Sequence, residues 1–279
     1  MEAIQTGLRG VLRLILFLVL ITGYAVHAGF FALILRDPKK RRHAFQKNTR
    51  FFSGLMLKSL GLKLIVTNRP TDSHQGSLIV SNHMGFIDIL ILASVMPVSF
   101  ITSHEMKENT LLGPITELAG CMYVERRSRT RILEEMKSLA MALKEGFDVV
   151  LYPEATSTNG ERVLPFKRTL MMAAAEAGVP IRPAVVNFRE VNGEDFHVKW
   201  RDSVCWYGDV SFGTSFWGTL TLKSVTAEIE FLDVITVNPG DDRGLIADKA
   251  HALISSKFVP VKGAMPEAET PGQLETDPT

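Results

Sequence analysis

The chain has 279 residues, of which 46% are hydrophobic and 22% are charged, and its formal net charge is +1. A balance this close to neutral argues against a general nucleic-acid binder, so any attraction to an anionic membrane must come from local clusters of charge. Once the two ends are set aside, about 200 residues remain, which suits one domain with a sizeable core.

The N-terminal region is predicted to attach the protein to a membrane. Residues 14–35 carry no formal charge and are dense in Leu, Ile, Val and Phe. A helix of that length is about 33 Å long, enough for a hydrocarbon core of roughly 30 Å. Lysines and arginines crowd residues 36–50, against only Arg9 and Arg13 before the segment, which predicts that the following domain faces the cytoplasm. Two arrangements fit the apolar segment: a full crossing, or a helix lying within one leaflet.

The next segment mixes aromatic and basic residues. Residues 44–62 set Phe51, Phe52 and Leu55 among lysines and arginines, which is typical of a basic helix lying on an anionic leaflet. The alternative is a helix simply packed on the domain. We therefore predict a membrane-anchoring region over residues 1–60.

Residues 61–259 alternate between strand and helix patterns. Strands are predicted over residues 62–67, 77–81, 121–126, 147–151, 181–186 and 227–232, and helices over residues 130–145, 170–177 and 243–256. This alternation indicates an α/β domain, a mixed sheet flanked by helices. The apolar and basic segments before it are expected to form an N-terminal membrane-associated helix pair. Residues 260–279 are rich in Pro, Glu and Thr and are predicted to be a disordered tail.

A histidine and an aspartate stand five residues apart directly after a buried-strand pattern. His83 and Asp88 lie where strand 77–81 ends and a helix begins, so the turn can fold the two side chains toward each other. No serine or cysteine nucleophile accompanies them. A general base with an orienting carboxylate suits a reaction whose substrate brings its own nucleophile, such as a hydroxyl. The structural alternative is a helix-starting aspartate beside an incidental histidine.

The chain contains a second pair with the same spacing. His197 and Asp202 lie within residues 196–204, which alternate like a strand. Residues five apart on a strand project to opposite faces. We therefore predict that this second pair forms no dyad.

Four ordered blocks resemble the glycerolipid acyltransferase family, whose bacterial 1-acylglycerol-3-phosphate acyltransferases carry the same sequence of motifs. The blocks here are Asn82-His-Met-Gly-Phe-Ile-Asp88, Gly120-Cys-Met-Tyr-Val-Glu-Arg126, Tyr152-Pro-Glu-Ala-Thr-Ser-Thr158 and Val179-Pro-Ile-Arg-Pro183, with Phe166-Lys167 between the last two. A later segment, Trp206-Tyr-Gly-Asp209, is similar to one found in a subset of the bacterial enzymes. The resemblance covers about residues 60–235.

The resemblance implies a membrane-bound enzyme that moves a fatty acyl chain from a thioester donor to a lysophospholipid hydroxyl. Its first-choice acceptor is 1-acylglycerol-3-phosphate, which would become phosphatidic acid, and the donor is acyl-CoA or acyl carrier protein. No bound cofactor and no metal are implied. The catalytic residues would be His83 and Asp88, and the substrate-binding residues would be Asn82, Arg126, Glu154, Thr156 and Lys167.

Two departures from the family pattern bear on the acceptor. Ala155 stands where the family has glycine, a small change that a compatible backbone angle would tolerate. Ser157 replaces an arginine that clamps phosphate bidentately, which serine cannot do. This favours a lyso-ornithine lipid or another lysolipid as the second candidate acceptor. Two alternatives belong to other functional classes. One is a membrane hydrolase that uses the same pair on water, although no Gly-x-Ser-x-Gly elbow is present. The other is a non-catalytic lipid-binding protein.

Overall fold

The computed structural model describes residues 2–71, 76–110, 112–125 and 129–264. Its strands are β1 (Leu62–Thr67), β2 (Leu78–Ser81), β3 (Ser99–Ser103), β4 (Met122–Val124), β5 (Val149–Leu151), β6 (Ile181–Val191), β7 (Glu194–Asp195) and β8 (Val225–Phe231). Its α-helices are α1 (Glu2–Ile34), α2 (Pro38–Ser59), α3 (Phe86–Val95), α4 (His104–Glu108), α5 (Leu112–Leu118), α6 (Arg129–Lys144), α7 (Ala173–Ala177), α8 (Arg201–Val204), α9 (Phe212–Thr221) and α10 (Arg243–Lys257). Two 3-10 turns, η1 (Thr169–Met172) and η2 (Val198–Trp200), complete the fold.

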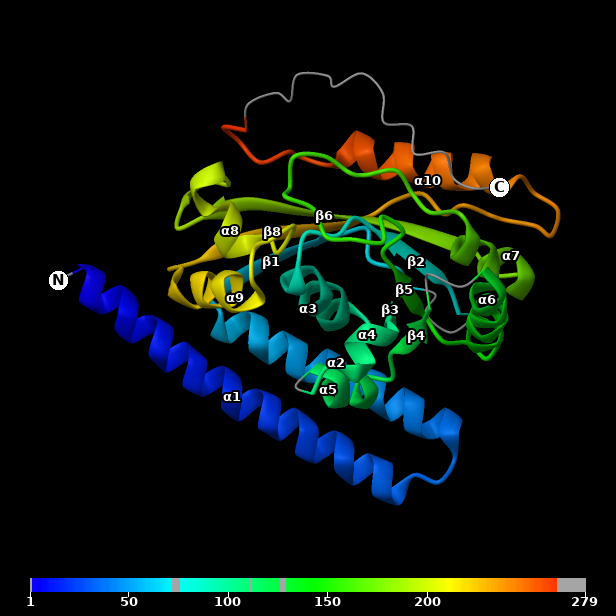
Figure 1. The fold of residues 1–279 in the computed structure, drawn as a ribbon, viewed down its shortest axis with the longest axis horizontal. Helices are drawn as coiled ribbons and strands as arrows, with labels where there is room; N and C mark the ends of the chain where they lie inside the picture. Colours follow the sequence, from blue (N-terminus) through cyan, green and yellow to red (C-terminus); the bar gives the residue numbers. More distant parts are fainter. Residues whose placement is uncertain (1, 72–75, 111, 126–128, 265–279) are drawn as a thin grey trace.

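The strands form one mixed sheet in the order β1-β8-β6-β2-β5-β3-β4, with β7 paired to β6. Strands β6, β2, β5, β3 and β4 run parallel to one another, whereas β8 is antiparallel to β6 and carries β1 parallel to itself. The predicted α/β class with a mixed sheet is therefore confirmed (Figure 1). Because β2 and β5 are adjacent and parallel, the loops that follow them meet at the same edge of the sheet.

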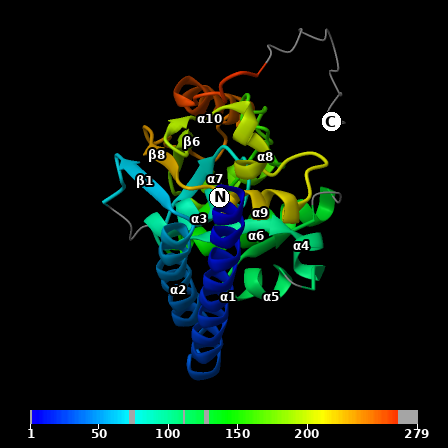
Figure 2. The ribbon, with the colours of Figure 1, turned by 90° about the vertical axis from the view of Figure 1, so that its left-hand side faces the viewer.

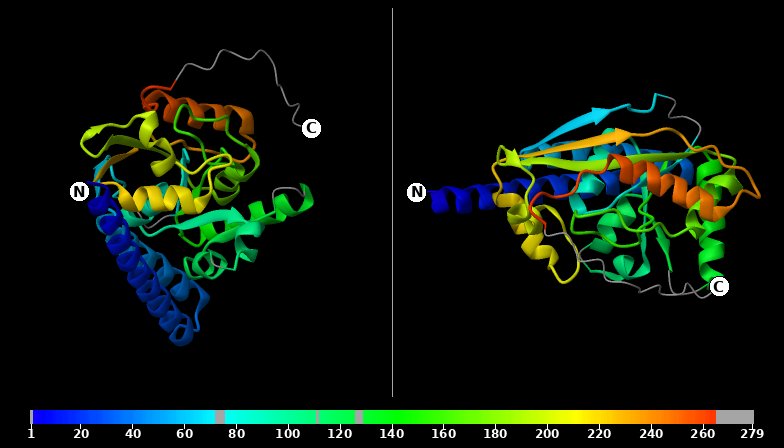
Figure 3. Two further views of the ribbon diagram at one scale, coloured as in Figure 1. Left: turned by 60° about the vertical axis from the view of Figure 1, so that its left-hand side comes forward. Right: turned by 90° about the horizontal axis from the view of Figure 1, so that it is seen from above.

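Helices cover both faces of the sheet, and the alternation of side chains along each strand divides the core in two. In β2, Leu78 and Val80 face the cluster that contains residues of α6, α7 and α10, whereas Ile79 faces the cluster that contains residues of α3. Figure 3 shows α10 on one side of the sheet and the N-terminal helices on the other. A strand that is buried on both faces consists of a continuous run of apolar residues, so β2 could be predicted from the sequence.

Helices α1 and α2 lie side by side, as Figure 2 shows, but differ in character. In the described part of the chain, α1 alone is long and apolar enough to cross a membrane, over residues 3–34 at a mean hydropathy of 2.1. Helix α2 begins at Pro38, capped by Asp37, and buries polar as well as apolar side chains against the domain. Its Gln46 amide donates to Ser99 Oγ (3.2 Å) and to the carbonyl of Asp148 (3.3 Å). The expected pair of membrane helices therefore reduces to one apolar helix, with α2 packed on the domain.

Arginines near the start of α1 bind the end of α9. Arg9 Nη1 donates to the carbonyl of Thr221 at 2.8 Å, and the Arg13 guanidinium donates to the carbonyls of Leu222 and Lys223 at 2.5 and 3.1 Å. Carbonyls at a helix C-terminus carry partial negative charge and favour cations. The N-terminal part of α1 is therefore held against the domain.

The structure differs from the sequence expectations in the following places. Strand β3 was not predicted, because its residues 99–103 carry two serines and a threonine that weaken the apolar pattern. Residues 196–204 do not form a strand but turn through η2 into α8. Val261, which was placed in the predicted tail, is buried, and its N–H donates to the carbonyl of Gly160 at 2.8 Å. The remainder of the predicted tail, 265–279, lies outside the described residues, and its disorder stays a prediction.

Candidate active site

The predicted dyad forms where β2 ends and α3 begins. His83 Nδ1 lies 3.0 Å from Asp88 Oδ2, with the carboxylate fully buried and the imidazole keeping 18% of its exposure. This contact favours the tautomer that carries its proton on Nδ1 and leaves Nε2 open to a substrate. In the described part of the chain no serine, threonine or cysteine side chain hydrogen-bonds the ring.

The turn before α3 holds Asp88 in place. Its Oδ2 also accepts the backbone N–H groups of Met84 (2.5 Å) and Gly85 (2.9 Å), which precede the helix. A carboxylate in the first turn of a helix is stabilised by the exposed N–H groups there. The same carboxylate that caps α3 therefore orients His83, and the two readings of Asp88 taken from the sequence are both realised.

The third block supplies a buried carboxylate that binds the dyad turn. Glu154 Oε1 accepts the N–H of His83 at 2.8 Å, and Oε2 accepts the N–H of Leu164 at 2.7 Å. Burial raises the pKa of the Glu154 carboxyl to about 7; the two accepted N–H bonds oppose this rise, and the charge of Asp88 adds to it. Glu154 thus ties the first block to the third, a role that the sequence did not suggest.

Asn82 is committed to the fold. Its amide Nδ2 donates to the carbonyl of Val186 (3.0 Å), and its Oδ1 accepts the N–H of the same residue (2.9 Å), with the side chain buried. Both polar groups of Asn82 are occupied by strand β6. The expected contact between Asn82 and the substrate therefore gives way to a structural role, in which the residue fixes the end of β2.

The loop after Glu154 contains the two departures from the family pattern. Ala155 has φ of 61°, in the left-handed region that glycine adopts freely and alanine only with strain, so the backbone angle here is not one that tolerates the change without cost. Thr156 is exposed. The hydroxyl of Ser157 donates to the carbonyl of Trp206, whose N–H donates to the carbonyl of Met84 at 2.7 Å. Ser157 therefore supports the dyad turn through the segment that begins at Trp206.

Of the two side chains expected to bind phosphate, the structure describes only Lys167. Lys167 is exposed, and its N–H donates to the carbonyl of Pro153 at 2.8 Å, which keeps it beside the third block. Arg126 lies outside the described residues. Their roles stay predictions.

The second His–Asp pair forms no dyad, although for a different reason from the one expected. His197 Nδ1 accepts the N–H of Lys199 at 3.3 Å, and Asp202 accepts the hydroxyl of Tyr207 at 2.9 Å. The two side chains are thus directed to separate partners at the start of η2 and in α8.

Sequence reasoning missed one aromatic neighbour of the dyad. Tyr152 follows β5 directly, and its ring stacks on the imidazole of His83 with centroids 4.1 Å apart and planes 15° apart. Its position at the head of the third block was the available signal, because β2 and β5 pair and the blocks after them must therefore meet.

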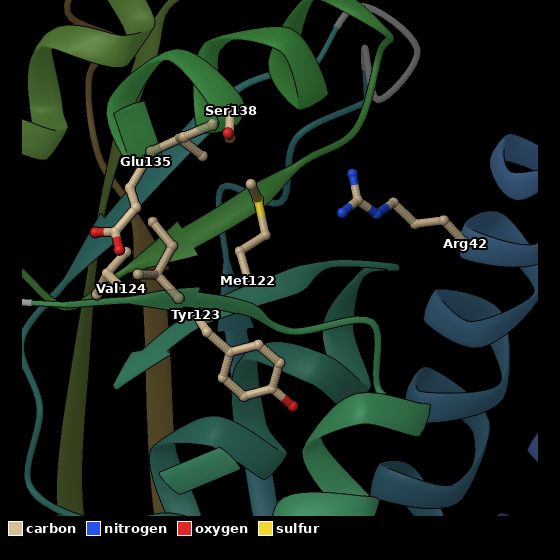
Figure 4. Close-up of a pocket in the computed structure, with 8 residues that line it drawn as sticks. Arg42, Met122, Tyr123, Val124, Glu135 and Ser138 are labelled. Carbon is tan, nitrogen blue, oxygen red and sulfur yellow. The ribbon is translucent and has the colours of Figure 1, made fainter. Parts of the chain in front are cut away.

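The domain has two notable cavities. One, of about 220 Å³, lies between α2, α6 and the β3–β4 edge of the sheet, with Arg42 and Glu135 on opposite sides (Figure 4). Among the described residues, none of the predicted site residues lines it. The other, of about 190 Å³, is lined by third-block residues that include Ser157 and Thr158 and by Tyr207. Thr158 adjoins the dyad, because its N–H and hydroxyl both donate to the carbonyl of His83. Among the described residues, no group of three or more His, Cys, Asp or Glu side chains is arranged to hold a metal ion.

Comparisons with known proteins agree with this geometry. A family model described as Acyltransferase matches residues 63–187. The 1-acyl-sn-glycerol-3-phosphate acyltransferase of Neisseria gonorrhoeae is 30% identical over 187 residues, which cover 67% of this chain and 71% of that protein. The lyso-ornithine lipid O-acyltransferase of Brucella abortus is 30% identical over 222 residues, covering 75% and 82%. The crystal structure of a 1-acyl-sn-glycerophosphate (LPA) acyltransferase from Thermotoga maritima shares the fold, with a TM-score of 0.66 over 92% of this chain and 95% of that chain at 18% identity.

The matched segment runs from β1 into β6 and contains both halves of the site. It includes the His83–Asp88 pair and the Glu154 carboxylate that binds the turn between them. The motifs, their spatial convergence and the similarity over most of the length of two relatives agree. This chain belongs to the acyltransferase family.

Proposed function

We propose that the enzyme moves a fatty acyl chain from a thioester donor to the hydroxyl of a lysolipid at a membrane surface. The proposal rests above all on the 3.0 Å contact between His83 Nδ1 and Asp88 Oδ2, which leaves Nε2 for the substrate. Because no nucleophilic side chain is bound to the imidazole in the described residues, the acceptor hydroxyl itself would act as the nucleophile.

The reaction then follows from the dyad. His83 Nε2 takes the proton of the acceptor hydroxyl as its oxygen attacks the thioester carbonyl carbon. The resulting tetrahedral intermediate collapses, the carbon–sulfur bond breaks, and the imidazolium gives its Nε2 proton to the leaving sulfur, which regenerates neutral His83. Asp88 keeps the Nδ1 proton in place throughout and stabilises the transient positive charge. Products are the diacyl lipid and a free thiol.

The first candidate acceptor is 1-acylglycerol-3-phosphate, giving phosphatidic acid. Its support is the name of the Neisseria relative. In this reading Lys167 and Arg126 hold the phosphate, and Glu154 and Thr156 contact the glycerol part. Glu154 accepts one N–H bond at each oxygen, so a glycerol hydroxyl would use the remaining lone pairs.

The second candidate acceptor is a lyso-ornithine lipid. It is favoured by Ser157, whose hydroxyl bonds the carbonyl of Trp206 where the family pattern has a phosphate-clamping arginine. The Brucella relative carries that activity in its name. The donor for either acceptor is acyl-CoA or acyl carrier protein, with no bound cofactor.

We also propose that the enzyme is bound to the cytoplasmic side of a membrane, with α1 lying within one leaflet. The Arg9 and Arg13 contacts to the end of α9 support this, because they would keep the N-terminus of α1 on the side of the domain. Exposed apolar side chains lie along one face of α1, at Ile4, Leu8, Leu12, Ile15, Val19, Val26, Phe30 and Leu33, and others such as Val11, Leu16 and Leu18 widen this stripe. Such a stripe suits burial in the acyl region of one leaflet.

A panel of lysolipid acceptors, assayed with acyl-CoA and with acyl carrier protein, tests the proposal. His83→Ala should lower acyl transfer by about 10²-fold or more, and Asp88→Asn should lower it strongly through tautomer and orientation. His197→Ala serves as the matched control and should leave the rate within about twofold. Full activity of the His83 variant would refute the dyad, and release of free fatty acid without acylated lipid would identify a hydrolase.

A further inference from the structure

The ring of Tyr152 packs against the imidazole of His83, the proposed general base. The Tyr152 and His83 rings are nearly parallel, with centroids 4.1 Å apart, and the Phe100 ring lies nearly parallel to Tyr152 with centroids 6.4 Å apart. Tyr152 is buried, at 8% exposure. A stack this close restricts rotation of the imidazole about its side-chain bonds.

The sheet explains why this contact exists. Val80 of β2 is paired with Leu151 of β5, so the chain that leaves β5 at Tyr152 runs beside the chain that leaves β2 towards His83. Side chains at the same edge of two adjacent parallel strands are forced together. The stack is thus a consequence of strand register and does not depend on a flexible loop.

The phenol oxygen of Tyr152 takes no part in binding His83. It is buried without a hydrogen-bond partner among the described residues, as is Asp88 Oδ1. Burial, followed by the charge of Asp88, raises the pKa of Tyr152 well above its usual value, so the phenol stays neutral. What Tyr152 presents to His83 is the face of its ring.

We propose that Tyr152 is a positioning residue for the acyl transfer, which holds the plane of the His83 ring and stabilises the imidazolium formed when His83 accepts the acceptor's proton. The face of an aromatic ring carries partial negative charge and attracts a cation stacked on it. The stabilisation exists only while His83 is charged, so it favours the transition state over the resting enzyme. This inference rests on the proposed role of His83 as general base.

Other titratable groups surround His83 and enter any pH profile. Asp88 of α3 binds Nδ1, and Glu154 of the third block, with its pKa near 7, binds the backbone N–H. Cys205 is buried nearby; burial and then the charge of Asp88 raise the pKa of its thiol well above the usual value. Variants at Tyr152 are therefore compared at one fixed pH.

The first experiment compares Tyr152→Phe with Tyr152→Leu and Tyr152→Met in the full-length enzyme in lipid vesicles. The Phe variant should keep kcat/KM within about threefold, because it keeps the ring face. The Leu and Met variants should lose roughly tenfold, mostly in kcat, with the acceptor KM within about twofold.

A second measurement removes any effect of misfolding. Fluorinated phenylalanines incorporated at position 152 keep the ring's shape while withdrawing charge from its face, so kcat/KM should fall stepwise with each added fluorine. Equal loss in Tyr152→Phe and Tyr152→Leu, or kcat/KM independent of fluorination, would overturn the proposal. If His83→Ala were active, the base assignment itself would fail, which is a separate result from a failed stack.

Discussion

The backbone N–H of His83 donates to Glu154 Oε1 at 2.8 Å, so the first and third sequence blocks are joined by a hydrogen bond through a buried carboxylate. The other Glu154 oxygen accepts the N–H of Leu164. Loss of this carboxylate would therefore loosen the dyad turn as well as any contact with the acceptor.

Glu154 should make stability depend on pH. Its pKa is about 7 in the folded protein against an ordinary value of 4.5. The folded state therefore binds the proton more tightly than the unfolded state does. The stability that protonated Glu154 contributes is fully present below about pH 4.5 and is lost as the pH rises through 7. The shift corresponds to about 3 kcal/mol of unfolding free energy. Urea unfolding in detergent at pH 5 and pH 8 should show a larger fall for the wild type than for Glu154→Gln; equal falls would contradict the assignment.

Ala155→Gly should stabilise the third-block loop. The residue has φ of 61°, where glycine avoids the steric cost that alanine meets. We expect the unfolding free energy to rise by about 1 kcal/mol, reduced by the greater freedom of glycine in the unfolded chain. Thermal unfolding measures this, with Ala252→Gly at an exposed position inside α10 as a control that should destabilise by roughly 1 kcal/mol. A less stable Ala155→Gly variant would show that the loop does not carry this strain.

Ser157 should support the site without reading the headgroup. Its hydroxyl binds the carbonyl of Trp206, so Ser157→Ala should lower kcat/KM about fivefold for every acceptor, the effect of one ordinary hydrogen bond. Ser157→Arg should impair all acceptors because the larger side chain displaces the Trp206 segment. An improvement with lysophosphatidic acid alone would instead indicate a vacant phosphate clamp.

Lys167→Gln provides the contrasting case. If the acceptor is a phosphomonoester, loss of this cation should lower kcat/KM by roughly tenfold or more, and loss of Arg126 should do the same. A zwitterionic amino-acid lipid should be affected much less. Indifference of lysophosphatidic acid turnover to both changes would move the assignment to the lyso-ornithine lipid.

Deletions should separate the anchor from the domain. Removing residues 1–34 should release protein from membranes or make it insoluble without detergent, while the domain still unfolds cooperatively in detergent. Removing residues 1–60 also removes α2, with Gln46 bound to Ser99 and Leu57 in the core, and should abolish cooperative unfolding. Fractionation and thermal unfolding report both outcomes, and a folded, soluble and active product of the longer deletion would contradict this division.

The sequence by itself determined the class of the fold and the dyad. Buried strands such as β2 and helices such as α6 have apolar residues at regular periods, so local pattern and length identify them. His83 and Asp88 are five residues apart across one strand-to-helix turn, and their meeting needs only that turn. The four blocks indicated the family for the same reason, because each block is a continuous stretch of chain.

What the tertiary structure decided are contacts between segments far apart in the chain. Three such contacts depend on the order of the strands and on their register. They are the stack of Tyr152 on His83, the hydrogen bond that Glu154 accepts from the His83 N–H, and the hydrogen bond from Ser157 to Trp206. The sequence alone does not decide whether Asn82 faces a substrate or the protein interior, because its bond to Val186 depends on β6 lying beside β2. Strand order follows from packing the whole sheet between two helical layers, and no local period in the sequence encodes that choice.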